Sequence, residues 1–149
     1  MYSFSNSIII SERVKDVFKF FQELKFLPIV WDYILVEDIS NNREMKSGLE
    51  FNTSLLSDNK NLMAKLKILE ITPNKAFSIL NKKGGVEIAY NYTFKEIDRY
   101  TQIHCIVEAD LENFNEELAN QIFEVIKEED FHHLDKIRDY FGRGKVSNL

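Results

Sequence analysis

Residues 77–107, FSILNKKGGVEIAYNYTFKEIDRYTQIHCIV, decide the fold of this chain. Two pairs of turn residues, Gly84-Gly85 and Asp98-Arg99, divide the stretch into three runs that are rich in β-branched and aromatic side chains. Such runs are typical of β-strands, and Gly-Gly is typical of two-residue hairpin turns, because glycine readily adopts positive φ angles. The stretch therefore predicts three consecutive antiparallel strands.

The two turns also predict which residues lie opposite each other. Counting back from a two-residue Asp98-Arg99 turn gives the pairs Ile97–Tyr100, Phe94–Ile103, Tyr92–Cys105, Tyr90–Val107 and Ile88–Ala109. Counting through Gly84-Gly85 gives Phe77–Tyr92, Ile79–Tyr90 and Lys82–Glu87. Opposed residues share a face of a sheet, so both turns place apolar partners on one face. We expect Tyr92 to point into the core and Thr93, opposite His104, to point away from it.

Further strands are expected before this stretch. The full expected set is Tyr2–Ile10, Tyr33–Ser40, Leu49–Ser57, Leu62–Thr72, Lys75–Lys83, Val86–Ile97 and Tyr100–Leu111. The Pro73-Asn74 turn admits two registers. We prefer the register that continues the apolar face through Leu66 and Ile68, and then through Phe51 and Leu55.

Helical patterns stand near both ends of the chain. Ser11 is the expected N-cap of a helix whose apolar positions recur at helical spacing, namely Val14, Val17, Phe18, Phe21 and Leu24. Pro28 interrupts it, which leaves Phe26–Trp31 as a second short helix or a tight connection. Asn113 and Glu116 are the expected capping pair of a long C-terminal helix that ends near Phe141, with Gly142 as its C′ residue. Residues 143–149 are expected to form a loose tail.

The length and the cysteine content limit the class of protein. The 149 residues predict one domain, since domains usually have about 100–200 residues. A single cysteine, Cys105, allows no intramolecular disulfide, which fits a reducing compartment. The N-terminus lacks the basic and apolar segments of a signal peptide, and the longest apolar runs are too short to span a bilayer. We therefore expect a cytoplasmic protein without a membrane span.

The charge balance argues against a nucleic-acid partner. The net charge is −5, from 24 acidic and 19 basic residues, and Lys82-Lys83 is the only adjacent basic pair. Proteins that bind nucleic acids usually present a basic stripe, because neutralising phosphates supplies much of their affinity. We expect no nucleic-acid binding.

The order of the elements resembles the helix-grip fold of the START-like, or SRPBCC, superfamily. This superfamily includes polyketide cyclase, Bet v 1-like and chaperone-activator relatives. The resemblance covers Phe4 to Phe141 and rests on the order strand, helix pair, about six antiparallel strands and long helix. It also rests on stretches such as Tyr90–Phe94 followed by Tyr100–Ile103. It selects no subfamily, and the superfamily has no common catalytic signature.

The resemblance implies a fold and a place for a ligand. The implied fold is α+β, with a curved antiparallel sheet of about seven strands wrapped around the C-terminal helix and two short helices after the first strand. Members bind a hydrophobic or amphipathic molecule between the sheet and this helix, with or without chemistry. The residues expected to line such a cavity are Trp31, Phe51, Thr53, Ile68, Phe77, Ile79, Asn81, Tyr90, Tyr92, Cys105, Val107, Ile122 and Ile126.

Several of these residues have two interpretations. The hydroxyls of Tyr90 and Tyr92 are either polar groups inside an apolar pocket or parts of ordinary core aromatics. Trp31 either gates the pocket or plugs the small end of the core. A buried Asn81 must find hydrogen-bond partners, either in a ligand or in backbone and water.

Two catalytic or metal-binding hypotheses fail on geometry. His104 and Cys105 are adjacent in a strand, so they point to opposite faces and form no nucleophile–base pair. Residues 128–133, EEDFHH, place Glu128 near His132 and Glu129 near His133 on a helix, and are the densest set of metal-ligand types in the chain. Two ligands from one helix do not make a site, so we expect neither a metal nor a cofactor.

Three functions follow from these observations. The leading hypothesis is a binding protein for a small hydrophobic or amphipathic molecule. The second is a cyclase-, dehydratase- or hydrolase-like enzyme that uses polar residues of the same cavity. The third is a protein-interaction module of the chaperone-activator type, which would act through its surface.

Overall fold

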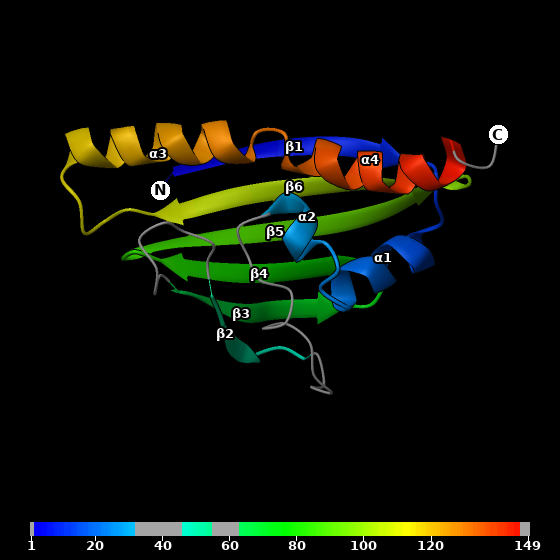
Figure 1. Ribbon diagram of the computed structural model, residues 1–149, viewed down its shortest axis with the longest axis horizontal. Helices are drawn as coiled ribbons and strands as arrows, with labels where there is room; N and C mark the ends of the chain where they lie inside the picture. The colour runs from blue at the N-terminus through cyan, green and yellow to red at the C-terminus, as the bar shows by residue number, and fades with distance from the viewer. Residues whose placement is uncertain (1, 32–45, 55–62, 147–149) are drawn as a thin grey trace.

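The computed structural model describes residues 2–31, 46–54 and 63–146, and of residues 51–54, 63, 64, 83 and 143–146 it describes the backbone. Its described strands form one antiparallel sheet in the order β1-β6-β5-β4-β3-β2 (Figure 1). They are β1 (Tyr2–Ile10), β2 (Glu50–Ser54), β3 (Met63–Thr72), β4 (Ala76–Lys83), β5 (Val86–Ile97) and β6 (Tyr100–Asp110). The helices are α1 (Val14–Gln22), α2 (Leu27–Val30), α3 (Glu116–Asp130) and α4 (His133–Val146). The strand expected at 33–40 lies outside the described residues, so the described sheet has six strands rather than about seven.

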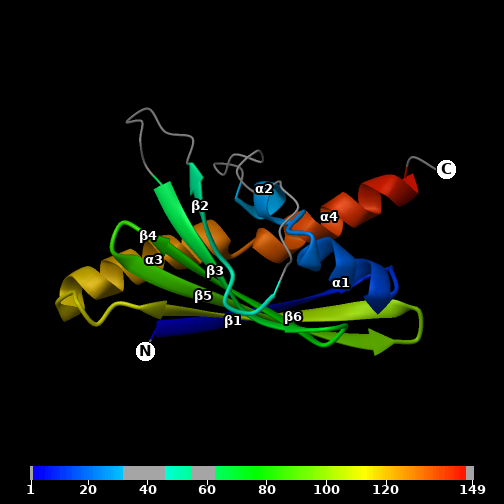
Figure 2. The same cartoon turned by 90° about the horizontal axis from the view of Figure 1, so that it is seen from below.

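The sheet curves, and the helices lie on its concave side (Figure 2). The apolar stripe of α1 buries Val17, Phe18 and Phe21 against this face, and α4 packs along β1 and α2. Ile126 and Ile137 from the C-terminal helices belong to the same core as Tyr92. The C-terminal helices therefore cover the predicted apolar face, as expected.

The strand registers predicted from the two turns are confirmed. The pairs of β5 with β6 include Phe94–Ile103, Tyr92–Cys105, Tyr90–Val107 and Ile88–Ala109. The pairs of β4 with β5 include Phe77–Tyr92, Ile79–Tyr90 and Lys82–Glu87. Tyr92 is buried and Thr93 is exposed, so the predicted strand parity is also correct.

The Pro73-Asn74 hairpin uses two registers in succession. Near the turn, Ile71 pairs with Phe77, and beyond an irregularity at Leu69 the pairing shifts so that Ile68 lies opposite Ile79. Leu69 is the extra residue of this bulge and is exposed. The preferred register is therefore confirmed from Ile68 onward, with Leu66 paired to Phe51. Leu55 lies outside the described residues.

The expected helix ends need correction. The N-cap of α1 is Arg13, which makes no side-chain cap bond, rather than Ser11. The side chain of Arg13 instead pairs with Glu96 at 2.8 Å. The N-cap of α3 is Asn115, whose side chain accepts from the backbone N–H of Leu118 at 2.8 Å, rather than Asn113.

The C-terminal helix is broken, which the sequence did not predict. The expected continuous helix is two helices, α3 and α4, separated by Phe131 and His132. α4 also continues through Gly142 to Val146, so Gly142 is not a C′ residue and part of the expected tail is helical. Glycine inside a helix costs only about 1 kcal/mol relative to alanine, so Gly142 does not have to end the helix. No close contact requires a glycine here either, because a Cβ at Gly142 would meet no atom within 4 Å.

Among the described residues, no helix is long and apolar enough to cross a membrane.

Candidate functional site

Asp130, the last residue of α3, is a buried carboxylate whose two oxygens are both hydrogen-bonded. It is 5% exposed. The Tyr90 hydroxyl on β5 donates to Oδ2 at 2.5 Å, and the Trp31 indole N–H, just after α2, donates to Oδ1 at 3.4 Å. A buried charge is costly unless it is paired or hydrogen-bonded, and these two donors supply the bonds. Asp130 thereby fastens α3 and α2 to the sheet.

His133, the first residue of α4, has one bonded and one unbonded ring nitrogen. Its Nδ1 lies 2.9 Å from the backbone oxygen of Asp130. A carbonyl oxygen only accepts, so Nδ1 carries the proton and Nε2 is an acceptor in the neutral ring. Burial lowers the pKa of His133, which keeps the ring neutral near neutral pH. Nε2 is buried and has no hydrogen-bond partner among the residues that the structure describes.

One long-range and one local hydrogen bond hold the break between α3 and α4. The Asn6 side-chain amide, on β1, donates to the backbone oxygen of Phe131 at 2.9 Å. The Nδ1–H of His133 donates to the backbone oxygen of Asp130. Helix ends leave carbonyls without intrahelical partners, and these two side chains satisfy two of them.

Tyr92 lies next to His133 and carries a hydroxyl without a nitrogen or oxygen partner in the described part of the chain. The imidazole lies against both β5 tyrosines, with ring centroids 5.9 Å from Tyr90 and 5.8 Å from Tyr92. Burial raises the pKa of Tyr92 well above its usual range, with a smaller contribution from the Cys105 thiol on the opposed strand. The Tyr92 hydroxyl therefore keeps its proton, and a thiol is the only hydrogen-bonding neighbour that it has among the described residues.

Cys105 is a buried thiol rather than a nucleophile. Burial is the main cause that raises its pKa, and the charge of Asp130 raises it further. The thiolate, which is the reactive form, is thus disfavoured. His104 points away and contacts Ser7 on the other face at 2.6 Å.

Asn81 is the third buried side chain with an unbonded polar atom. Its Oδ1 has no partner among the described residues. Asn81 lies opposite Ile88, whereas Phe77 lies opposite Tyr92, four residues away along β4. At about 3.3 Å of rise per residue, this separates Asn81 from Tyr92 by roughly 13 Å along the sheet.

The residues expected to line a cavity are gathered on the concave face where their side chains are described. Most are buried in one core, namely Trp31, Ile68, Phe77, Ile79, Tyr90, Tyr92, Cys105, Val107 and Ile126, and Ile122 is partly buried against it. Asn81 is buried on the same face. Phe51 and Thr53 pair with Leu66 and Ala64 through their backbones, and their side chains lie outside the described part. That these residues line a ligand cavity stays a prediction.

The sequence interpretation considered His133 only as a metal ligand and did not place Asp130 or His133 in the core. Ile126, Asp130, His133 and Ile137 lie at i, i+4, i+7 and i+11, which is the apolar stripe of one helix. Two polar residues at core positions were the signal that could have found them. The Glu128 and Glu129 partners considered for the histidines are exposed, and His132 contacts Asp135 at 3.0 Å. Within the described ranges, no group of three or more His, Cys, Asp or Glu residues could hold a metal ion.

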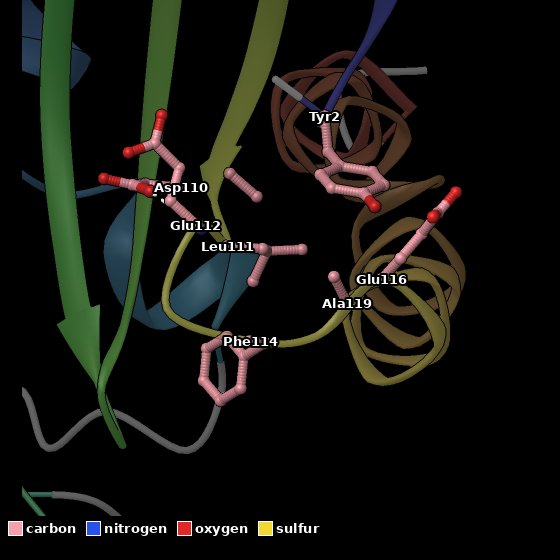
Figure 3. A pocket seen from close by; sticks show the side chains of 8 residues that line it. Tyr2, Asp110, Leu111, Glu112, Phe114, Glu116 and Ala119 are labelled. Carbon is pink, nitrogen blue, oxygen red and sulfur yellow. Dashed lines mark hydrogen bonds between the residues drawn. The ribbon is translucent and has the colours of Figure 1, made fainter.

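A hollow lies at the start of α3, and neither Asp130 nor His133 lines it (Figure 3). Its volume is about 210 Å³, and it is lined by Tyr2, Ala109, Asp110, Leu111, Glu112, Phe114, Glu116 and Ala119. Figure 3 shows Tyr2, Leu111 and Ala119 around the hollow, with the Glu116 carboxylate near its rim. None of these residues belongs to the expected cavity.

Comparison with known proteins identifies the fold but no family. Neither a protein-family model nor a curated protein matches the chain. Solved structures match over nearly its whole length. MLL2253 from Mesorhizobium loti is 13% identical with a TM-score of 0.70, covering 95% of this chain and 98% of that one. Ara h 8.0201 is 13% identical with a TM-score of 0.70, covering 94% and 97%.

DynU16, a putative protein in the dynemicin biosynthetic locus, is also similar. It is 10% identical with a TM-score of 0.63, covering 95% of this chain and 48% of that one. The chain has the helix-grip fold. At these identities the similarity shows the fold alone, and function must come from the site.

Proposed function

We propose that this chain binds a small hydrophobic or amphipathic molecule between the sheet and the helices, with the polar end of the ligand at Tyr92 and His133. One observation carries the proposal. Three buried side-chain atoms, Asn81 Oδ1, Tyr92 Oη and His133 Nε2, have no nitrogen or oxygen partner among the described residues, and the Tyr92 hydroxyl has the Cys105 thiol as a weak neighbour. Buried polar atoms are nearly always hydrogen-bonded, so a bound molecule is a natural source of the missing partners.

The surroundings of these atoms support a ligand of low polarity. Phe21 and Phe26 contact the Tyr92 ring with centroid distances of 4.7 and 5.7 Å, and Trp31 contacts Tyr90 at 4.7 Å. A mostly apolar lining with a few convergent polar groups is the usual composition of a small-molecule site. The fold shared with DynU16, described as a protein of a biosynthetic locus, is compatible with this role.

Binding of a neutral environment-sensitive dye, N-phenyl-1-naphthylamine, tests the proposal. We expect saturable binding that quenches or shifts the emission of Trp31, the only tryptophan in the chain, because Trp31 contacts Tyr90 and Asp130. Tyr92→Ala and the filling substitution Cys105→Phe should change the dye affinity. Thr93→Ala, on the exposed face, is the matched control and should not. Equal affinities in all variants, or no binding, would show that the proposal is wrong.

Proton abstraction is a second candidate function, favoured by the unbonded Nε2 of a neutral His133 beside a hydroxyl. For a bound ketone, Nε2 would take a proton from the carbon next to the carbonyl. The Tyr92 hydroxyl would donate a hydrogen bond to the oxygen that becomes the enolate. Exchange of the α-protons of 2-octanone in D2O, followed by NMR, tests this step. Exchange that is no faster than with His133→Gln would leave binding as the function.

A further inference from the structure

We infer that the ligand carries a hydroxyl group at its buried end, so that it is an alcohol or a phenol rather than a carboxylic acid or an amine. This inference rests on the proposed function and narrows it to a chemical class. The inference follows from the hydrogen-bonding roles of the unbonded atoms, because His133 Nε2 accepts whereas the Tyr92 hydroxyl can donate.

The site offers acceptors that only a donor can satisfy. His133 Nε2 accepts, because the single ring proton is committed to the Asp130 backbone oxygen through Nδ1. Asn81 Oδ1 is also an unbonded acceptor within the described residues, but it lies roughly 13 Å from Tyr92 along the sheet and is not part of the pair that the buried end of the ligand meets. A ligand group that reaches His133 must therefore donate a hydrogen.

Tyr92 adds a hydrogen-bond donor beside His133, and a ligand hydroxyl can accept from it. Its phenol is a donor as well as an acceptor, and its ring lies 5.8 Å from that of His133. The two groups do not bond to each other, since both atoms are unbonded in the described part of the chain. A ligand hydroxyl that reaches both groups would donate to Nε2 and accept from Tyr92 at the same time. An ether oxygen could only accept, so it would leave Nε2 unbonded.

Charge disfavours the other two ligand classes. A carboxylate ligand only accepts, so it could not donate to Nε2. It would also lie near the carboxylate of Asp130, which is a buried charge of the same sign. An ammonium group donates, but its burial costs several kcal/mol, and both oxygens of Asp130 are already bonded to Tyr90 and Trp31. A neutral hydroxyl avoids both penalties.

Four probes of equal chain length test the inference by displacing N-phenyl-1-naphthylamine. They are 1-octanol, octyl methyl ether, octanoate and octylamine. We expect 1-octanol to bind about fivefold to tenfold more tightly than the ether, as the gain of one hydrogen bond implies. Octanoate and octylamine should bind more weakly than 1-octanol.

Substitutions test whether the preference for the alcohol over the ether arises at His133 and Tyr92. In His133→Phe the ratio of ether to alcohol dissociation constants should fall to near one. His104→Phe, on the opposite face, is the control and should keep the wild-type ratio. Tyr92→Phe removes a donor from which both the alcohol and the ether accept, so it should weaken both probes and keep the wild-type ratio. This variant serves if His133→Phe fails to fold by circular dichroism, and a ratio near one in Tyr92→Phe would then overturn the inference.

The outcomes separate the inference from the proposed function. If the dye does not bind wild-type protein, the proposed function is wrong and the inference falls with it. If the dye binds but the ether displaces it as well as the alcohol, the function stands and a water molecule, not a ligand hydroxyl, serves His133. Tightest binding by octanoate or octylamine, or no displacement by any probe, would likewise overturn the inference alone.

Discussion

Tyr90 and Tyr92 are two tyrosines on the same face of β5, both buried, with hydroxyls in opposite situations. The hydroxyl of Tyr90 bonds to the Asp130 carboxylate at 2.5 Å and ties the C-terminal helices to the sheet. The hydroxyl of Tyr92 has no nitrogen or oxygen partner in the described residues, although the ring is packed by Phe21 and Phe26. Strand parity places both rings in the core. Only the Tyr90 hydroxyl meets the carboxylate of Asp130, at the end of α3, so only this hydroxyl links the sheet to the C-terminal helices.

The difference has an energetic meaning. A hydrogen bond to a charged group contributes about 1.5–3 kcal/mol, whereas a buried polar group left unbonded costs about 1–3 kcal/mol. The Tyr90 side of the cluster thus stabilises the fold, and the Tyr92–His133 side lowers its stability unless something binds there. Regions that cost stability in this way are typical of binding sites.

The largest expected effect concerns the Tyr92 ring. Tyr92→Ala should lower the free energy of unfolding by about 2–4 kcal/mol, because it removes a fully buried aromatic ring and leaves a cavity. Thr93→Ala, which is exposed, should cost less than about 1 kcal/mol. Chemical denaturation of both variants measures the difference. Equal costs would mean that β5 does not present these two faces.

The next effect concerns the Tyr90 hydroxyl. Tyr90→Phe keeps the ring but leaves Oδ2 of Asp130 without its donor, so we expect a loss of about 1.5–3 kcal/mol in the free energy of unfolding. Tyr100→Phe, at the exposed first residue of β6, is the matched control and should change stability by less than about 0.5 kcal/mol. A loss at Tyr90 no larger than the control would show that the bond to Asp130 contributes nothing.

The third effect is the pH dependence that His133 gives the protein. Burial lowers the pKa of His133 in the folded state below the 6.5 of a free histidine. At pH values between the two pKa values, the unfolded state therefore binds more protons than the folded state. Stability is therefore full above about pH 6.5 and falls as the pH drops below it, by about 1.4 kcal/mol for each unit of pKa difference. Asp130, Asp135 and Lys136 also act on this ring.

Denaturation at pH 7 and pH 5 of wild type and His133→Gln isolates this contribution, since other titrating groups are common to both proteins. Wild type should lose more stability than His133→Gln between these two pH values. The same loss in both proteins would mean that the histidine titrates normally and is not buried.

The sheet could be predicted because its information is local. A two-residue turn fixes the register of both strands that it joins, and the alternation of side chains then assigns Tyr90, Tyr92 and Cys105 to one face. The bulge at Leu69 was hidden because both registers of the Pro73-Asn74 hairpin place apolar residues inward. The structure uses one register on each side of the bulge.

The helix break could not be predicted because several of the contacts that hold it join residues distant in sequence. Asn6 lies 125 residues from Phe131, whose carbonyl it serves, and Trp31 lies 99 residues from Asp130. Local helix signals alone favour continuity through residues 128–133. Cap positions were missed for a simpler reason, since Asn113 and Asn115 both suit an N-cap and the two lie close together.

The smallest effect on stability is expected from Tyr92→Phe, and its sign separates the two tyrosines. Removing an unbonded buried hydroxyl should leave the free energy of unfolding unchanged or raise it by up to about 1 kcal/mol, whereas Tyr90→Phe lowers it. Chemical denaturation of the two single variants and of the double variant measures this contrast, and the two effects should add if the hydroxyls are independent. A loss in Tyr92→Phe as large as that in Tyr90→Phe would mean that the Tyr92 hydroxyl has a partner within the protein. His133 Nε2 and Asn81 Oδ1 would then be the remaining candidates for contact with a ligand.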